Sequence, residues 1–173
     1  MVPAGSWQQR KRVNRLNRMS IQESAAAYES ATQYFLNLAR GVMKDHLDTK
    51  NPEGWSARQI IHHLADSHMN AFIRFKLGLT EEHPTIKPYD QNKWAETVDV
   101  KNVPVNNSIT LLHALHRRWH ALLITLNESD FMRTVYHPEQ QKDISLWQLL
   151  QIYAWHGKHH ATQVIQFKER VSL

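Results

Sequence analysis

The sequence LLQIYAWHGKHHATQVIQF, at residues 149–167, combines a helical apolar pattern with three histidines, His156, His159 and His160. With about 100° of rotation per residue, His156 and His160 lie one turn apart on the same face of a helix. That face is the apolar one, because it also carries Leu149, Ile152, Tyr153, Gln163, Val164 and Phe167. Two inward imidazoles at this spacing are able to offer two nitrogens to one metal ion. The alternative is one buried histidine with ordinary hydrogen bonds and one histidine that faces solvent.

The composition indicates one globular domain without cysteine chemistry. The chain has 173 residues, of which 42% are hydrophobic, and this is enough for a sizeable core. The absence of cysteine excludes disulfides, thiolate metal sites and a cysteine nucleophile, so histidine, aspartate and glutamate remain as metal ligands. No apolar stretch is long enough to span a bilayer and no signal-peptide core is visible. We therefore predict a cytoplasmic protein with no membrane contact.

Much of the formal net charge of +5 comes from the beginning of the chain. Five basic residues precede the first acidic residue, Glu23, and these are Arg10, Lys11, Arg12, Arg15 and Arg18. We predict a flexible basic tail over residues 1–19 and a single domain over residues 20–173. A basic tail alone is weak evidence for nucleic-acid binding, so no nucleic-acid partner is predicted.

Four amphipathic segments predict four helices. Ser20, Ser56 and Ser145 each precede a Glu or Gln by three residues, which is the capping-box pattern of helix starts. The predicted helices cover residues 21–43, 56–77 and 108–126, the third with Ser108 as its cap, and the stretch after Ser145 that contains the opening motif. Four such helices predict an all-α four-helix bundle.

Two of the connections are also informative. Residues 80–107 contain three prolines and interleaved aromatic residues, which predicts an ordered covering loop. This loop is long enough to cross the bundle, so the second and third helices are able to run parallel. Residues 134–144 alternate apolar and polar side chains and predict a small hairpin.

A third metal ligand would come from a facing helix, and helical periodicity leaves three candidates open. His63 lies at the flank of the apolar side of the second helix and His68 lies nearer its middle, whereas His62 projects away from that side. In the third helix, His116 lies at the edge of the apolar stripe and forms a rival pair with His120, and neighbouring arginines favour a position nearer solvent. The pattern alone does not choose among His63, His68 and His116.

The acidic residues narrow the kind of metal site. A di-iron bundle requires inward Glu residues and Glu-x-x-His motifs, and the second and fourth helices contain no such motif. A mononuclear, histidine-rich site suits zinc or nickel, and also iron or copper.

A longer match goes beyond these patterns. It consists of GWSARQIIHHLADSHMN at residues 54–70, RFKL at 74–77, PYD at 88–90, YHP at 136–138 and the histidines of the opening stretch. Together these motifs resemble the DinB/YfiT-like metalloprotein family, and in particular its YfiT branch of metal-dependent hydrolases. The resemblance covers residues 47–167.

The resemblance implies a fold, a ligand set and an assembly. The fold is a four-helix bundle of up-down-down-up topology, and the assembly is a homodimer. One divalent metal per chain, zinc or nickel, is held by His63 of the second helix and by His156 and His160 of the fourth. Gln163 stands where the branch often has a further histidine, so the surroundings of the ligands differ.

We therefore expect a metal-dependent hydrolase that acts on a small molecule and keeps a metal position open for water or substrate. Metal-dependent transfer of a low-molecular-weight thiol such as bacillithiol is the first alternative, and a non-catalytic metal-binding bundle is the second. No catalytic side chain is identified. Asp66, Asn70 and Arg74 lie near the His63 side of the second helix, where they are able to orient a ligand or bind substrate. For Arg74 a salt bridge is an equal alternative.

Overall fold

The computed structural model describes residue 37, residues 46–52 and residues 54–171. The predicted tail over residues 1–19 and, apart from residue 37, the predicted helix over residues 21–43 lie outside the described residues. None of the helices that the structure describes is long and apolar enough to cross a membrane.

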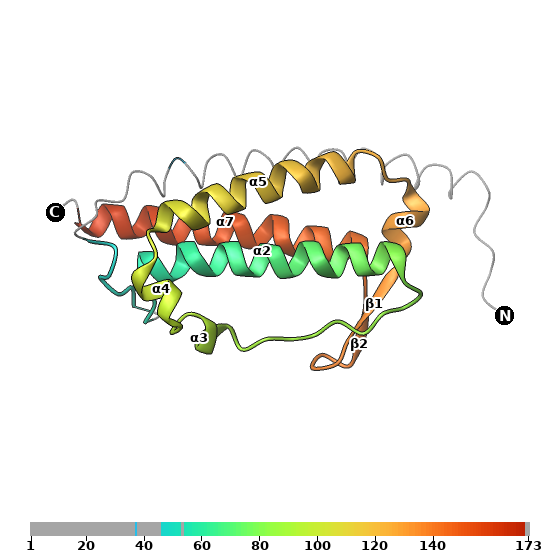
Figure 1. Cartoon of the computed structure of the whole chain (residues 1–173), viewed down its shortest axis with the longest axis horizontal. Helices are drawn as coiled ribbons and strands as arrows, with labels where there is room; N and C mark the ends of the chain where they lie inside the picture. Colours follow the sequence, from blue (N-terminus) through green and yellow to red (C-terminus); the bar gives the residue numbers. More distant parts are fainter. Residues whose placement is uncertain (1–36, 38–45, 53, 172–173) are drawn as a thin grey trace.

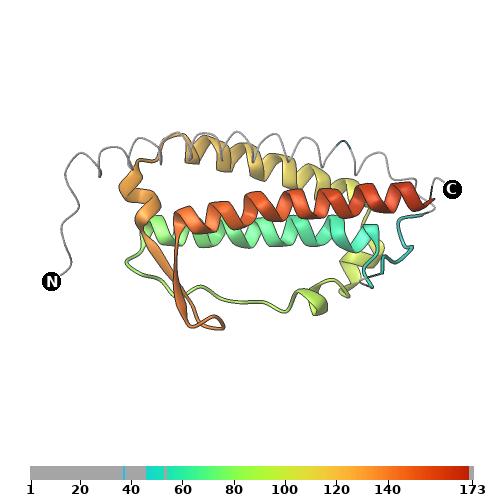
Figure 2. The same cartoon turned by 180° about the vertical axis from the view of Figure 1, so that it is seen from behind.

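Three long helices make up most of the described chain. They are α2 (Ala57–Thr80), α5 (Val105–Leu123) and α7 (Leu146–Val171). Their colours in Figure 1, and the reverse view in Figure 2, show that α2 and α5 run in the same direction while α7 runs in the opposite one. α2 packs against both of the others. The parallel arrangement of α2 and α5 is the one that the long 80–107 connection predicts.

The starts of these helices follow the capping patterns in two of three cases. The Ser56 side chain accepts from the Gln59 backbone, and the Gln59 side chain accepts from the Ser56 backbone. The same reciprocal pair joins Ser145 and Gln148 before α7. The prediction for Ser108 is wrong, because α5 begins three residues earlier, at Val105, without a side-chain cap.

The connection between α2 and α5 returns along the length of the bundle (Figure 1). It contains two short helices, α3 (Gln91–Trp94) and α4 (Val98–Asn102). Backbone hydrogen bonds fix one end, since the Ile86 amide donates to the Tyr136 carbonyl at 3.0 Å. The buried side chains of Ile86, Ala95 and Val100 hold the connection on the bundle. The segment is therefore an ordered cover, as its aromatic residues indicate.

The connection between α5 and α7 contains a short helix and a hairpin. The helix α6 (Glu128–Met132) precedes the antiparallel strands β1 (Thr134–His137) and β2 (Lys142–Ser145). The register pairs Val135 with Ile144, and both of these side chains are buried. The predicted hairpin is confirmed, whereas α6 has no counterpart in the sequence prediction.

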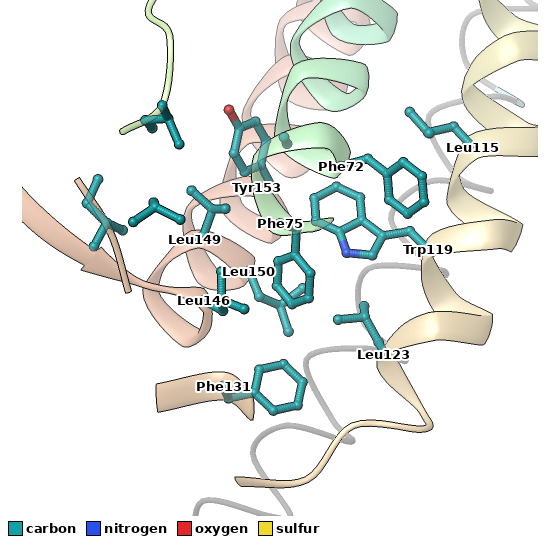
Figure 3. Close-up of a cluster of buried hydrophobic side chains, with 14 residues drawn as sticks. Phe72, Phe75, Leu115, Trp119, Leu123, Phe131, Leu146, Leu149, Leu150 and Tyr153 are labelled. Atoms are coloured by element: carbon teal, nitrogen blue, oxygen red, sulfur yellow. The ribbon is translucent and has the colours of Figure 1, made fainter. Parts of the chain in front are cut away.

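Two apolar clusters fill the described part of the bundle. The aromatic cluster lies toward the hairpin and includes Phe75, Trp119, Phe131, Leu146 and Leu150 (Figure 3). The aliphatic cluster lies toward the other end of the same helices and includes Ile60, Leu64, Leu112, Val164 and Phe167. On α2, α5 and α7, each buried histidine lies between the residues of the two clusters or next to residues at the edge of one cluster.

Candidate metal centre

Three histidines from two helices meet at one point of the bundle. His63 comes from α2, and His156 and His160 lie one turn apart on α7. The His63 Nε2 atom lies 3.4 Å from His156 Nε2, which in turn lies 3.0 Å from His160 Nε2. One ligand atom from each residue lies within 4.8 Å of the other two.

These separations fit a single metal ion. Histidine nitrogens that lie 2.0–2.1 Å from a tetrahedral zinc are about 3.3 Å apart, close to the two distances between Nε2 atoms. The donors are all nitrogens, which suits zinc, nickel and copper. Within the described part of the chain, no fourth His, Asp or Glu joins this group. The group therefore has three nitrogen donors that could hold one ion.

The second ring nitrogens of the α7 pair also have partners. His160 Nδ1 lies 2.6 Å from the side-chain oxygen Oε1 of Gln163, so Nδ1 carries the proton and donates it. His156 Nδ1 lies 3.4 Å from His68 Nε2. Partners of this kind fix the tautomer and orientation of ligand imidazoles and leave Nε2 with its lone pair. Gln163, at the position where the resembling branch often has a histidine, orients His160.

The surroundings keep the imidazoles of His63 and His156 neutral. Burial, together with the like charge of the neighbouring His160, lowers the pKa of His63 to about 3. Burial lowers the pKa of His156 to about 2, with His160 and then His63 as further causes. A neutral imidazole offers the lone pair that a metal requires.

A cavity of about 310 Å³ opens beside the three histidines. Its lining consists of Trp55, Ile60, His63, Gln91, Trp155, His156, His159, His160 and Gln163. The Trp155 ring is exposed and stacks on His159 with centroids 4.9 Å apart, and the Trp55 ring packs edge-on against His63. The lining has aromatic and amide groups but, among the described residues, no carboxylate, ammonium or guanidinium group.

The other candidate histidines occupy different places. His68 and His116 are buried and pair with each other, with His68 Nδ1 2.7 Å from His116 Nε2. They lie behind His156 rather than in the three-histidine group. The expectation that His116 lies toward solvent is wrong, because only 5% of it is exposed.

His62 is also buried, against the prediction that it projects away from the core. Its Nδ1 lies 2.7 Å from Ser108 Oγ and its Nε2 lies 3.2 Å from the Val103 carbonyl oxygen. The connection that crosses the bundle covers this side of α2, so a face that periodicity assigns to solvent is enclosed.

Asp66, Asn70 and Arg74 are the candidates for supporting roles, and the structure records no hydrogen bond from them to the three histidines. The Asn70 side chain donates to the Asp66 carbonyl oxygen at 2.9 Å. Arg74 is buried and donates to the Tyr153 hydroxyl at 3.3 Å and to the Lys87 carbonyl at 2.7 Å. Arg74 thus joins α2, α7 and the covering segment through hydrogen bonds, and no salt bridge is recorded for it among the described residues.

Comparison with known proteins gives a consistent family. The family model described as the DinB superfamily matches residues 8–164. Relatives of this chain carry the name "Putative metal-dependent hydrolase", and two of them serve as examples. OB0782 from Oceanobacillus iheyensis is 46% identical over 151 residues, which are 87% of each chain. YfiT from Bacillus subtilis is 47% identical over 138 residues, which are 79% of this chain and 78% of that protein.

Solved structures agree with the sequence matches. The structure of Bacillus subtilis YfiT, described as an unusual four-helix bundle, matches with a TM-score of 0.84 at 36% identity and covers 99% of this chain and 93% of that one. A mycothiol-dependent maleylpyruvate isomerase matches with a TM-score of 0.68 at 16% identity, over 83% of this chain and 60% of that chain. At that identity the second likeness shows a shared fold alone.

Proposed function

The chain belongs to the DinB superfamily and has the YfiT type of four-helix bundle, and on that premise we propose that it is a metal-dependent hydrolase. The ligands in this proposal are His63, His156 and His160. The observation that carries it is the convergence of their three Nε2 atoms beside a cavity. The names of the relatives, which are those of metal-dependent hydrolases, support the same reaction class.

A zinc or nickel ion bound by three neutral imidazoles supplies Lewis-acid chemistry and activates water as a nucleophile near neutral pH. The chain's own residues prepare that site. Gln163 accepts the Nδ1 proton of His160, and His63 and His156 stay unprotonated because they are buried. The side chain of His63 is held in place by the edge of the Trp55 ring.

The cavity indicates where a small substrate binds. Trp55, Ile60 and Trp155 offer apolar contact to one part of a substrate. The amides of Gln91 and Gln163 also line the cavity and are able to hydrogen-bond polar atoms of that substrate. An ester or amide of modest size that carries an apolar group is the substrate class that this lining suits.

The absence of a fourth ligand in the described part of the chain supports catalysis over a purely structural metal site. Transfer of a low-molecular-weight thiol uses the same three ligands, so the ligand geometry does not separate it from hydrolysis. Thiol transfer, the choice between zinc and nickel, and the homodimer stay predictions.

Metal analysis of protein purified without an affinity tag tests the ligand set. We expect about one divalent ion per chain in the parent, and far less in His63→Ala and His160→Ala, since two imidazoles hold a divalent ion more weakly than three. His159→Ala is the matched control, because His159 lies beside His160 and lines the cavity but is not in the three-histidine group. It should keep the metal.

The reaction class is tested on the same preparations. A panel of esters and amides, and in parallel a thiol with an alkylating electrophile, is assayed with metal-loaded and chelator-treated protein. Metal-dependent hydrolysis that is lost in His63→Ala supports the proposal. Metal content that is unchanged in both ligand variants, or turnover of the thiol pair alone, would overturn it.

A further inference from the structure

Two buried histidines stand directly behind the proposed ligand His156. His68 on α2 is completely buried, and His116 on α5 is 5% exposed. His156 Nδ1 lies 3.4 Å from His68 Nε2, and His68 Nδ1 lies 2.7 Å from His116 Nε2. The three rings therefore form a chain that crosses from α7 through α2 to α5.

The directions of these hydrogen bonds follow from the metal end of the chain. If His156 uses its Nε2 lone pair for the metal, the proton of the neutral ring is on Nδ1 and points at His68 Nε2. His68 then accepts at Nε2, carries its own proton on Nδ1 and donates to His116 Nε2. Each ring in the chain is thus the Nδ1–H tautomer, and each bond has one donor and one acceptor.

The packing around His68 leaves its ring little freedom to turn. The Tyr153 ring packs edge-on against it, with centroids 5.4 Å apart. The rings of His116 and His156 lie on either side of the His68 ring, with centroids 4.8 and 5.6 Å away. The neighbouring elements therefore hold the ring in the plane that faces both His156 and His116.

We propose that His68 and His116 are positioning residues that select the Nδ1–H tautomer of His156 and so present its Nε2 lone pair to the metal. This inference rests on the proposed function, since it takes His156 as a ligand. The usual partner of a ligand imidazole is a carboxylate, a backbone carbonyl or water. Here the partner is a neutral imidazole, which orients His156 without adding negative charge beside the metal.

Zinc affinity is the first test, measured by competition with a chromophoric chelator on variants whose helical circular dichroism matches the parent. His68→Leu removes the acceptor, and we expect zinc affinity to fall about 10- to 100-fold, as for other partners of ligand histidines. His68→Gln places an amide oxygen where Nε2 accepts, so its affinity should stay within a few fold of the parent. His116→Leu should weaken zinc binding although His116 does not touch His156, because His68 loses the acceptor that fixes its own tautomer.

His62→Leu is the matched control. His62 is a buried histidine on the same helix whose partners are Ser108 and Val103, away from the three-histidine group. Its loss should lower stability while leaving zinc affinity at the parent value.

The second test reads the tautomer directly, from ¹⁵N chemical shifts of the imidazoles in metal-free protein. His156 should be the Nδ1–H tautomer in the parent and in His68→Gln, and a mixture of tautomers in His68→Leu. An unchanged His156 tautomer in His68→Leu, or equal losses of zinc affinity in His68→Leu and His68→Gln, would overturn the proposal. If the parent protein bound no zinc, the proposed ligand set would be wrong instead. The tautomer measurement would still test whether His68 and His116 select the Nδ1–H tautomer of His156.

Discussion

The aromatic cluster near the hairpin and the buried histidines beside it, which we call the histidine layer, share the helices α2, α5 and α7 but differ in chemistry. The cluster also takes residues from the covering segment, α6 and the hairpin. The aromatic cluster packs rings and aliphatic side chains with no charged member. Beside it and toward the aliphatic cluster, α2, α5 and α7 turn imidazoles inward, five of them less than 9% exposed: His62, His63, His68, His116 and His160. The buried imidazoles therefore form a polar layer between the aromatic and aliphatic clusters, and this layer overlaps the edges of both.

The difference between the two layers shows how a bundle accommodates buried polar groups. An imidazole that leaves water without a hydrogen-bond partner costs free energy, so each buried ring must find one. His62 pairs with Ser108 and Val103, His68 pairs with His116, and His160 pairs with Gln163. We expect the aromatic cluster to supply stability and the histidine layer to supply function, and the predictions below test that division.

The largest effect is expected from Phe75→Ala in the aromatic cluster. Phe75 is fully buried, and its ring packs on Trp119 and Phe131. The truncation should lower the free energy of unfolding by about 3–5 kcal/mol, through lost burial and a cavity. Urea denaturation measures this, and Ile73→Ala, an exposed residue of the same helix, should change it by less than about 0.5 kcal/mol. The folded fraction of Phe75→Ala should still bind zinc, since no ligand is altered.

Metal binding should stabilise the protein through the other layer. At a free zinc concentration of about a thousand times the dissociation constant, the gain in free energy of unfolding is about 4 kcal/mol. His63→Ala should gain far less, whereas Phe75→Ala should gain as much as the parent. Thermal unfolding with and without chelator measures the gain. An equal gain in His63→Ala would mean that zinc stabilises the fold from somewhere else.

The sequence predicts which face of a helix points inward better than it predicts which distant segments cover the other faces. Most of the inward face of α7 follows from helical periodicity because every residue from Leu149 to Phe167 is in one uninterrupted helix. The prediction is wrong for Ile152, which the same periodicity assigns to this face but which is 47% exposed. His62 shows the limit, since its burial depends on Val103 and Ser108, which lie 41 and 46 residues further along the chain. A local pattern carries no information about which distant segment covers a given face.

The choice of His63 over His68 shows the same limit within one helix. Both histidines are buried on α2, and periodicity alone leaves both as candidates. His63 points to the cavity and His68 points to α5, and only the relative placement of three helices decides this. The family motif carries that information because it records the arrangement of a whole fold.

Two glycines allow the packing around the helix backbone to be compared between the aromatic cluster and the histidine layer. A Cβ atom at Gly78, near the hairpin, would lie 2.7 Å from Leu146 Cδ2 and 3.0 Å from Val135 Cγ1. We expect Gly78→Ala to lower the free energy of unfolding by about 1–3 kcal/mol, because it overpacks the aromatic cluster.

Gly157→Ala is the matched control in the histidine layer. The nearest atom to its Cβ would be His68 Cε1 at 3.9 Å, an ordinary contact, so alanine should be neutral or stabilise the helix by up to about 1 kcal/mol. Urea denaturation of both variants measures the sign of the change in the free energy of unfolding. A Gly78→Ala protein as stable as the parent would show that the hairpin end is more loosely packed than these distances indicate.

The smallest effect is expected at Asp66, an acid on the helix that carries His63. Burial, together with the charge of Asp99, raises the pKa of its carboxyl group from 3.8 to about 6. Between these two values the folded protein holds a proton that the unfolded chain has lost, so stability falls as the pH rises from about 4 to about 6. Above pH 6 the folded protein bears the full free-energy cost of the buried, ionised carboxylate. A shift of about two pKa units corresponds to about 3 kcal/mol, and because the group is half-buried, solvent screening reduces the cost to about 1 kcal/mol.

Asp66→Asn should therefore match the parent at pH 4 and exceed its free energy of unfolding by about 1 kcal/mol at pH 7.5. Asp48→Asn gives the opposite sign, because the hydrogen bond from Arg58 lowers the pKa of Asp48. That contribution is present above pH 4 and is lost as the pH falls, and it is smaller because Asp48 is exposed. Urea denaturation at the two pH values measures both differences. If Asp66→Asn were less stable than the parent at pH 7.5, the ionised carboxylate would have a partner that stabilises it, and the polar layer would extend from the histidines to this acid.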